Sequence, residues 1–297
     1  MLVGNSFLVE NTRGGKMRYL IVSGSFFDAG GLAMIKGAMN GIKSLDEKAE
    51  FRSLHRRIHH KKGICETYTE PAQNKKAFKW ADVILDIGGL CAGQSNKYDW
   101  LKLRKKYDKP YVWMSQSFQF VDKRLLEGTI IVCRGKRTAQ LVKNAGFNCE
   151  IAPDLSFLVE PRKWTGKKYK RVFSTHFPKN IAQMYNICNK NTDIQVIEKP
   201  GYRREGEYWE PRLPIDSFTG PVEDNFGLIE SVNEVHTARY QIACAAILAG
   251  IKPALYTTGD EKYNEKYLDL MDFHGNTAKE LREAAMISCE AAVNAGK

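Results

Sequence analysis

The sequence lacks any apolar stretch of the roughly 18 uninterrupted residues that a membrane-spanning helix needs. It also lacks a signal-peptide pattern at its start, low-complexity tracts and repeats at the periods typical of solenoids. We therefore expect neither a membrane span, a secretion signal nor a repeat architecture. Hydrophobic residues make up 43% and charged residues 27% of the chain, an ordinary globular composition that excludes disorder over most of its length.

Paired metal ligands are missing as well. The seven cysteines are scattered and no two follow the CxxC spacing, so the sequence offers no zinc-binding pattern. His55, His59 and His60 come closest to a ligand group, but the arginines and lysines around them would repel a cation. We therefore expect no metal ion and no cofactor. Cys133 and Cys244 lie within apolar runs, which indicates buried free thiols and predicts a cytoplasmic location.

Positive charge, in contrast, is in excess. The 45 lysines and arginines outnumber the 34 aspartates and glutamates, which gives a formal net charge of +11. A protein this basic attracts anions such as phosphorylated metabolites, acidic glycans or nucleic acids. The densest basic run, residues 52–62, has cations that could bind a polyanion weakly, namely Arg52, Arg56, Arg57, Lys61 and Lys62. A solvated loop face is the simpler interpretation of this run.

Short apolar strands alternate with amphipathic helices from Met17 onward, which predicts an α/β fold with mostly parallel sheets. The polar stretch 159–170 contains proline and glycine and is interpreted as a linker. We thus predict an N-terminal extension (1–16) and two Rossmann-like domains (17–160 and 161–297). The expected strands are 19–23, 83–87, 111–115, 129–133, 149–152, 171–174, 194–197 and 254–257, and the expected helices are 32–45, 98–107, 136–144, 180–189, 237–249 and 277–295, with a long loop at 201–221.

Glycines follow two of the predicted strands, and they would let the backbone approach a ligand closely. Gly30 and Gly31 close a turn before a helix whose free N–H groups suit an anion. Gly88 and Gly89 come shortly after Asp86, whose carboxylate could bind a hydroxyl or orient a loop. Neither segment matches GxGxxG or a P-loop, so a plain βα turn and an Asx-stabilised turn remain alternatives.

Two further segments carry polar groups at a strand or helix end. Gln116 and Ser117 follow an apolar strand and offer neutral hydrogen-bonding groups that suit a polyol or a carboxylate. Arg239 lies at the start of a nearly all-apolar helix, where its guanidinium, the helix dipole and the free N–H groups all favour an anion. Alternatively, Arg239 pairs with a core carboxylate, Asp86 or Asp154, because an unpaired buried arginine is very costly.

Six segments occur together in a recognisable order, namely residues 24–34, 81–89, 109–120, 132–138, 152–158 and 237–266. Through them the sequence resembles the polysaccharide pyruvyl transferase family over most of residues 17–273. The resemblance implies a GT-B-like fold, in which two Rossmann-like domains face each other across a cleft. It also implies transfer of a pyruvyl group from phosphoenolpyruvate to a sugar or glycan hydroxyl, which forms a ketal.

The resemblance implies roles for individual basic residues. Arg239 matches the arginine of the family's Arg-x-His motif and would bind the anionic groups of the donor. Arg134 matches an arginine that follows a strand of the first domain, with a role in the structure or at the cleft wall. Lys262 or Lys266 matches a lysine placed after the strand that follows the motif helix.

The position of the motif histidine is occupied by Gln241 in this chain. The implied role of that histidine is general acid or base, and a glutamine cannot shuttle a proton. His236 precedes the helix and could take over the role, although an ordinary histidine at a strand–helix turn is the plainer interpretation. Asp86 and Glu234 are further candidates to move the proton. Altered chemistry or loss of activity would also fit.

Two other functions remain open at this stage. A GT-B-like glycosyltransferase would use the same helix-end site for the diphosphate of a nucleotide sugar. A non-catalytic relative would bind an acidic glycan or another polyanion.

Overall fold

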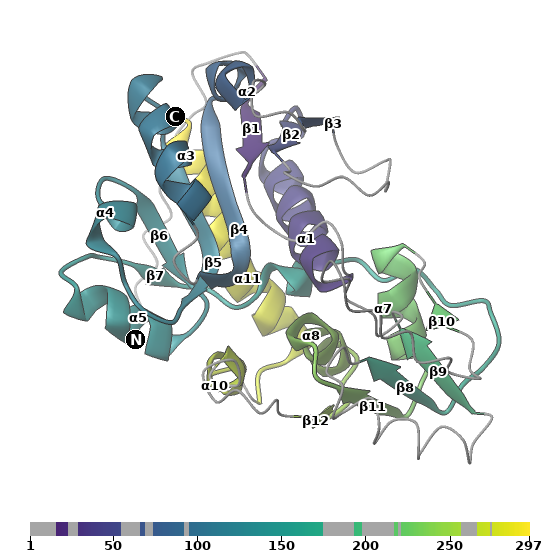
Figure 1. The fold of residues 1–297 in the computed structure, drawn as a ribbon. Coiled ribbons are helices and arrows are strands. Elements are labelled where there is room, and N and C mark those ends of the chain that lie inside the picture. Colours follow the sequence, from purple (N-terminus) through teal and green to yellow (C-terminus); the bar gives the residue numbers. More distant parts are fainter. Residues whose placement is uncertain are drawn as a thin grey trace, which may run out of the picture.

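The chain folds into two parallel β-sheets with helices packed on them (Figure 1). The computed structural model describes residues 16–22, 29–54, 66–68, 74–91, 95–174, 193–197, 217–218, 221–256, 266–273 and 275–297. All strand pairs within the described residues are parallel. The α/β class expected from the alternation of strands and helices is thereby confirmed.

The first sheet has the strand order β3-β2-β1-β4-β5-β6-β7. Its strands are β1 (Arg18–Ile21), β2 (Glu50–Leu54), β3 (Glu66–Tyr68), β4 (Val83–Cys91), β5 (Tyr111–Phe118), β6 (Ile130–Cys133) and β7 (Glu150–Ile151). The central strands are buried and mostly apolar where their side chains are described, as expected for a parallel sheet covered on both faces.

The second sheet has the strand order β10-β9-β8-β11-β12. Its strands are β8 (Arg171–Ser174), β9 (Ile194–Ile197), β10 (Ser217–Phe218), β11 (Glu234–Thr237) and β12 (Ala254–Leu255). Helices α7 (Val222–Glu230) and α8 (Tyr240–Leu248) share an apolar cluster with one face of this sheet.

Side chains alternate along β1 between two apolar clusters, one on each face of the first sheet. Leu20 and Val22 belong to the cluster built with α2 (Asn74–Trp80), α3 (Ser95–Lys106), α4 (Lys123–Leu126) and α5 (Lys136–Asn144). Tyr19 and Ile21 belong to the cluster built with α1 (Ala29–Leu45), the short 3-10 helix Leu155–Leu158 and α11 (Ala278–Ala295).

The last helix, α11, packs on the first sheet although it follows the second sheet in the chain (Figure 1). Thr277 and Glu280 form a capping box at its start, and Leu281, Ala285 and Cys289 are buried against the core of the first sheet. The sequence analysis had grouped residues 277–295 with the second domain. The chain thus crosses from the second sheet back to the first.

Helix α1 packs against both halves of the molecule. Its middle contacts the 3-10 helix so closely that a Cβ added at Gly37 would lie 1.8 Å from the carbonyl oxygen of Leu155. Its first residues, including Leu32 and Ala33, belong to the apolar cluster of the second sheet. A continuous core therefore joins the two halves on this side.

Several expected boundaries are confirmed, including those of α5, β8 and β9. Others are wrong. Helix α1 begins at Ala29, so that Gly30 and Gly31 lie in its first turn and not in a preceding loop. Strand β4 continues through Gly88 and Gly89 because it stays paired with β5 as far as Cys91.

The start of the basic run is also not a loop. Arg52 lies in β2, and its guanidinium stands 4.4 Å from the centroid of the Trp80 ring. The predicted helix 180–189, most of the loop 201–221, and Arg56, Arg57, Lys61, Lys62 and Lys262 lie outside the described residues. Among the residues that are described, no helix is long and apolar enough to span a membrane, and no three His, Cys, Asp or Glu side chains form a group that could hold a metal ion.

Candidate active site

A buried ion pair lies where the two halves of the molecule meet. Arg134 directly follows β6, and its Nε stands 3.4 Å from Oδ2 of Asp154, the residue that caps the 3-10 helix. Both side chains are almost fully buried, at 2% and 0% exposure. Burial alone would lower the pKa of the Arg134 guanidinium, but the carboxylate of Asp154 outweighs it and the pKa is raised. The Arg134 guanidinium is therefore charged at neutral pH.

The second half of the molecule contributes Gln241, from the first turn of α8, to this pair. Its Nε2 lies 3.4 Å from Oδ2 of Asp154, the same oxygen that faces Arg134. The same amide nitrogen lies 3.4 Å from the sulfur of Met34 in α1. The side chain at position 241 thus faces the first domain and contacts its charged pair.

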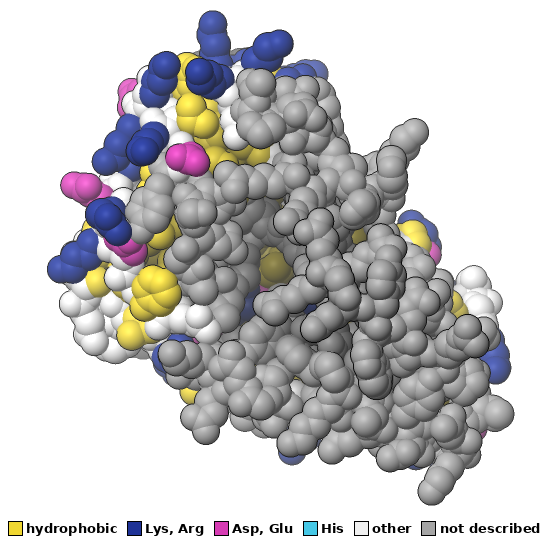
Figure 2. Space-filling view, in the orientation of Figure 1, with side chains coloured by type: hydrophobic (Ala, Val, Ile, Leu, Met, Phe, Trp, Pro, Cys, Tyr) yellow, Lys and Arg dark blue, Asp and Glu magenta, His cyan; other side chains and the backbone are white. Residues whose placement is uncertain are grey.

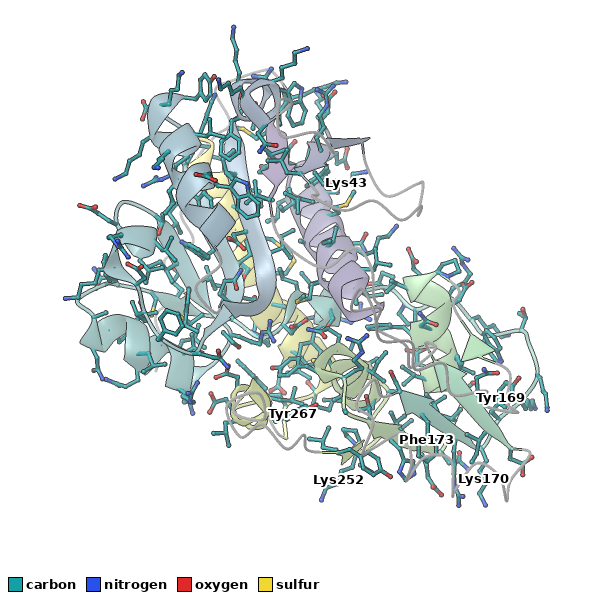
Figure 3. The ribbon with its side chains drawn as sticks, in the orientation of Figure 1. Lys43, Tyr169, Lys170, Phe173, Lys252 and Tyr267 are labelled. Atoms are coloured by element: carbon teal, nitrogen blue, oxygen red, sulfur yellow. The ribbon has the colours of Figure 1, made fainter. Side chains whose placement is uncertain are left out.

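An aromatic ring covers the guanidinium. The Tyr240 ring centroid lies 4.6 Å from Cζ of Arg134, within the range of a cation–π contact. Tyr267 of α10 (Lys266–Met271) stacks on Tyr240 with a centroid distance of 6.2 Å, and Figure 3 shows Tyr267 beside α8. Burial raises the pKa of the Tyr240 phenol well above its ordinary value, so this hydroxyl stays neutral.

Ser115 adopts a strained backbone at the same place. Its φ is +48°, a left-handed conformation uncommon for a non-glycine residue, and the register of β5 against β6 shifts here. The bulge turns the Ser115 carbonyl to Nε of Arg134, at 3.2 Å. Its hydroxyl contacts the carbonyl of Pro153 and the hydroxyl of Ser288 in α11. The strain is offset by these buried bonds.

A second buried carboxylate, Asp269 of α10, lies at the same edge of the first sheet. Its Oδ2 accepts hydrogen bonds from Ser117, at 2.6 Å, and from Thr138, at 3.3 Å. Its Oδ1 is buried without a hydrogen-bond partner. Burial raises the pKa of Asp269, although the bond from Ser117 and the charge of Arg134 act in the opposite direction. These bonds hold α10 against the first domain.

Comparison with known proteins identifies the family. A model of the polysaccharide pyruvyl transferases matches residues 29–224, about two thirds of the chain. The chain belongs to the polysaccharide pyruvyl transferase family. The matched region contains Arg134 and Asp154 and ends before α8.

Solved structures share the fold of this pyruvyl transferase family member. A putative UDP-N-acetylglucosamine 2-epimerase from Listeria monocytogenes aligns with a TM-score of 0.54 at 9% identity, covering 93% of this chain and 94% of that one. The UDP-GlcNAc 2-epimerase of Methanocaldococcus jannaschii aligns with a TM-score of 0.52 at 9% identity, covering 94% and 100%. These likenesses confirm the two-domain, GT-B-like arrangement. A search of curated proteins gives no match.

Arg239, the expected donor-binding residue, occupies the N-cap of α8 and not its first turn. It is half-buried, and its backbone N–H donates to Oγ1 of Thr237 at 2.8 Å. The next residues are Tyr240, which covers Arg134, and Gln241, which contacts Asp154. The start of α8 therefore stands directly beside the charged pair of the first domain.

The core carboxylates suggested as partners of Arg239 have other bonds. Asp154 pairs with Arg134. Asp86 accepts bonds from Tyr111, at 2.6 Å to Oδ2, and from Gln116, at 2.9 Å to Oδ1. Asp86 is fully buried, and these bonds tie β4 to β5. Gln116 thus supports the sheet, and the roles in binding or proton transfer foreseen for Asp86 and Gln116 stay predictions.

His236 lies in the middle of β11, where side chains alternate between the two faces of the sheet. Val235 belongs to the cluster shared with α7 and α8, so His236 points to the opposite face. Its ring stacks on Phe173 at a centroid distance of 4.4 Å, and its Nδ1 is 3.0 Å from the Tyr256 hydroxyl. This placement separates His236 from Gln241. Glu234 shares that face, and its bond to Arg171 lowers the pKa of its carboxyl, so that it is deprotonated at neutral pH and holds no proton to donate.

The structure brings together some predicted residues and adds others. Arg134, Ser117, Arg239 and Gln241 gather at the carboxyl edge of the first sheet and the start of α8, whereas His236 does not. Ser115 belongs to the cluster of hydrogen-bonding groups that the sequence places at the end of β5, but sequence reasoning missed its strained backbone and the contacts of Met34, Tyr240 and Asp269. The neighbouring Arg239-Tyr240-Gln241 could have drawn attention to Tyr240, but no local pattern marks the other three.

Proposed function

We propose that this protein transfers a pyruvyl group from phosphoenolpyruvate to hydroxyl groups of a sugar or glycan. In this reaction two hydroxyl oxygens bond to C2 of the donor and the phosphate leaves with its bridging oxygen. One hydroxyl proton is transferred to the methylene carbon, which becomes a methyl group, and the other goes to the phosphate. Family membership supports this reaction class, and the acceptor is accordingly a carbohydrate.

The observation that carries the proposal is the position of Arg239 at the start of α8, beside the Arg134–Asp154 pair. A helix start presents free N–H groups and a partial positive charge, and the guanidinium adds charge-assisted hydrogen bonds. Phosphoenolpyruvate carries a phosphate and a carboxylate, which need such donors. Arg134 is already paired, so its proposed role is to hold Asp154 and Gln241 in place.

Proton transfer is the step for which this chain lacks the family's histidine. Gln241 can donate a hydrogen bond through its amide but cannot supply a proton. We therefore propose that the natural protein transfers the pyruvyl group slowly, because general acid–base catalysis contributes roughly 10²–10⁴-fold to the rate of such a reaction. A histidine at position 241 would face Asp154, which could orient its ring. His236 points to the face of its sheet opposite to α8, and both carboxylate oxygens of Asp86 accept hydrogen bonds from β5.

The first test measures binding of phosphoenolpyruvate by isothermal titration to the natural protein and to Arg239→Ala. Binding should weaken by at least about ten-fold, because each charge-assisted bond contributes roughly 1.5–3 kcal/mol. Arg162→Ala is the matched control, since Arg162 is an exposed arginine paired with Asp224. Unchanged donor affinity in a folded Arg239→Ala protein would overturn the site. Tight binding of a UDP-sugar in place of phosphoenolpyruvate would favour the glycosyltransferase alternative.

The second test measures phosphate release from phosphoenolpyruvate with a panel of sugar acceptors. Gln241→His should raise the rate while leaving donor affinity within about two-fold, because the anionic contacts belong to Arg239. Gln241→Asn is the control for a change in side-chain size. A fast natural rate that Gln241→His does not increase would show that another group moves the proton. The expected cytoplasmic location stays a prediction.

A further inference from the structure

The first domain carries a band of lysines far from the ion pair of the candidate site. Six lysines of α2 and α3 are exposed, namely Lys75, Lys76, Lys79, Lys102, Lys105 and Lys106. Asp99 is the one acidic residue in these two helices. Figure 2 shows Lys and Arg side chains spread along the upper left margin, where Figure 1 places α2 and α3. We call these six lysines the α2–α3 basic face.

This face lies toward the end of the first sheet that is opposite to the candidate site. Lys79 shortly precedes β4, and Lys105 and Lys106 shortly precede β5, so they stand near the amino ends of these strands. Arg134 and Ser117 stand at the carboxyl ends of β6 and β5. The basic face therefore cannot contact a small donor bound at α8, and a ligand that engages both places must be long.

The chemistry of the face suits spaced, single negative charges. A lysine ammonium is a point charge on a flexible stem, without the rigid fork by which arginine grips one phosphate or one base. The half-buried Tyr107 directly follows two of these lysines, and Nζ of Lys106 is 5.8 Å from its ring centroid. An aromatic ring next to cations provides apolar contact for sugar rings that carry carboxylates.

We propose that the α2–α3 basic face binds the acidic polysaccharide chain that serves as acceptor and product. The inference rests on the proposed function, because each pyruvyl transfer adds one carboxylate to the glycan and makes the product a polyanion. Holding the modified chain at a second place raises the effective concentration of its next unmodified unit at the active site. The face thus binds the polymer, and the site at α8 binds the donor.

The test measures binding of alginate, a chain of carboxylate sugars, to the full-length protein at moderate salt, with dextran as the neutral probe. The first variant changes all six lysines of the face to glutamine. The matched control changes six exposed lysines elsewhere to glutamine, namely Lys163, Lys167, Lys168, Lys170, Lys252 and Lys279. Figure 3 shows two of these, Lys170 and Lys252, on the second half of the molecule. Both variants lose the same net charge, and equal melting temperatures confirm that both are folded.

We expect the affinity for alginate to fall at least about ten-fold in the first variant and less than about two-fold in the control, with a weaker salt dependence in the first variant only. An equal loss in both variants would overturn the proposal, since binding would then depend on net charge alone. Tighter binding of phosphatidylglycerol vesicles or duplex DNA through the same six lysines would also overturn it and identify a membrane or nucleic acid as the partner.

Turnover of a short acceptor separates this proposal from the proposed function. The first variant should transfer the pyruvyl group to a monosaccharide at the rate of the natural protein. On a long acidic acceptor it should be slower than the natural protein. Alginate binding that depends on the face, without any reaction of phosphoenolpyruvate, would overturn the proposed function but leave a specific acidic-glycan surface. Equal rates of the natural protein and the variant on the long acceptor would overturn the role of the face in catalysis.

Discussion

Arg134 organises the centre of the molecule because its guanidinium contacts groups from separate parts of the chain. It pairs with Asp154, bonds to the carbonyl of Ser115, lies beside the sulfur of Met34 and is covered by the ring of Tyr240. Such a pair is balanced only while both charges are present, since either one alone is buried without compensation.

Replacing Arg134 with Met should therefore strongly destabilise the protein. It leaves the Asp154 carboxylate buried and unpaired, and we expect the free energy of unfolding to fall by about 3–5 kcal/mol. Urea denaturation followed by circular dichroism measures this change. Arg124→Met is the control, because Arg124 pairs with Asp122 at 77% side-chain exposure and should change stability by less than about 1 kcal/mol. If Arg134→Met lowered the free energy of unfolding as little as Arg124→Met, the buried ion pair would not have the predicted importance for stability.

Asp269 predicts a pH dependence of stability. Burial raises its pKa in the folded protein above the model-peptide value, so the folded state holds the proton more tightly than the unfolded state. This carboxyl therefore destabilises the fold at neutral pH, and the effect fades as the pH falls through the folded pKa. Asp269→Asn imitates the protonated form and should raise the melting temperature at neutral pH, with the gain shrinking toward about pH 4.

A thermal scan between about pH 4 and 8 checks this prediction. Asp99→Asn, at an exposed position in α3, is the control and should shift the melting temperature little at any pH. A lower melting temperature of Asp269→Asn at neutral pH would mean that the charged form is needed, through its proximity to Arg134.

At the scale of elements, the contact between α1 and the 3-10 helix Leu155–Leu158 depends on a glycine. Alanine is normally preferred over glycine in a helix by roughly 1 kcal/mol. At Gly37 the added Cβ would lie 1.8 Å from the carbonyl oxygen of Leu155, so the two elements would have to separate. Packing, and not helix propensity, determines the residue at this position.

Gly37→Ala should accordingly lower stability by about 1–3 kcal/mol, in spite of its better helix propensity. Because the 3-10 helix begins next to Asp154, the substitution should also weaken donor binding. Chemical denaturation and titration of phosphoenolpyruvate measure the two effects. Lys43→Ala, on an exposed position of the same helix, is the control and should be neutral or slightly stabilising. A stabilising Gly37→Ala would show that α1 does not pack in this way.

For the whole molecule, α11 makes the first domain dependent on the end of the chain. Its buried residues Leu281, Ala285 and Cys289 complete the apolar cluster on one face of the first sheet. A chain that ends at residue 276 exposes this face, and we expect it to lose cooperative unfolding and to bind a hydrophobic dye. The control is the full-length chain with Lys279→Ala and Glu283→Ala, which changes exposed positions of the same helix.

Adding a peptide of residues 277–297 to the shortened chain should restore the near-ultraviolet circular dichroism signal, because the cluster is then covered again. A shortened chain that unfolds cooperatively at the natural midpoint would contradict this dependence. The core shared through α1 likewise predicts that the two halves unfold as one unit on this side.

Local periodicity was sufficient for many elements but not for the short or irregular ones. The bounds of α5, β8 and β9 follow from apolar patterns flanked by polar residues, and they are confirmed. The sequence analysis missed β2 and α2, whose runs are short and interrupted by charged residues such as Arg52. It ended β4 too early because glycines usually stop a strand, whereas pairing with β5 carries this one further.

The amino-acid sequence by itself determined the α/β class and the family, because these depend on local patterns and on the order of segments. The roles foreseen for Arg239 and Gln241 stay predictions. Only the tertiary structure decided which polar and charged side chains contact one another. Gln241 bonds to Asp154 across 87 residues of chain, and Ser115 contacts Ser288 across 173. Pairings of this kind depend on how sheets and helices pack together. A buried polar or charged group needs a partner close in space, and that partner can lie far away along the chain.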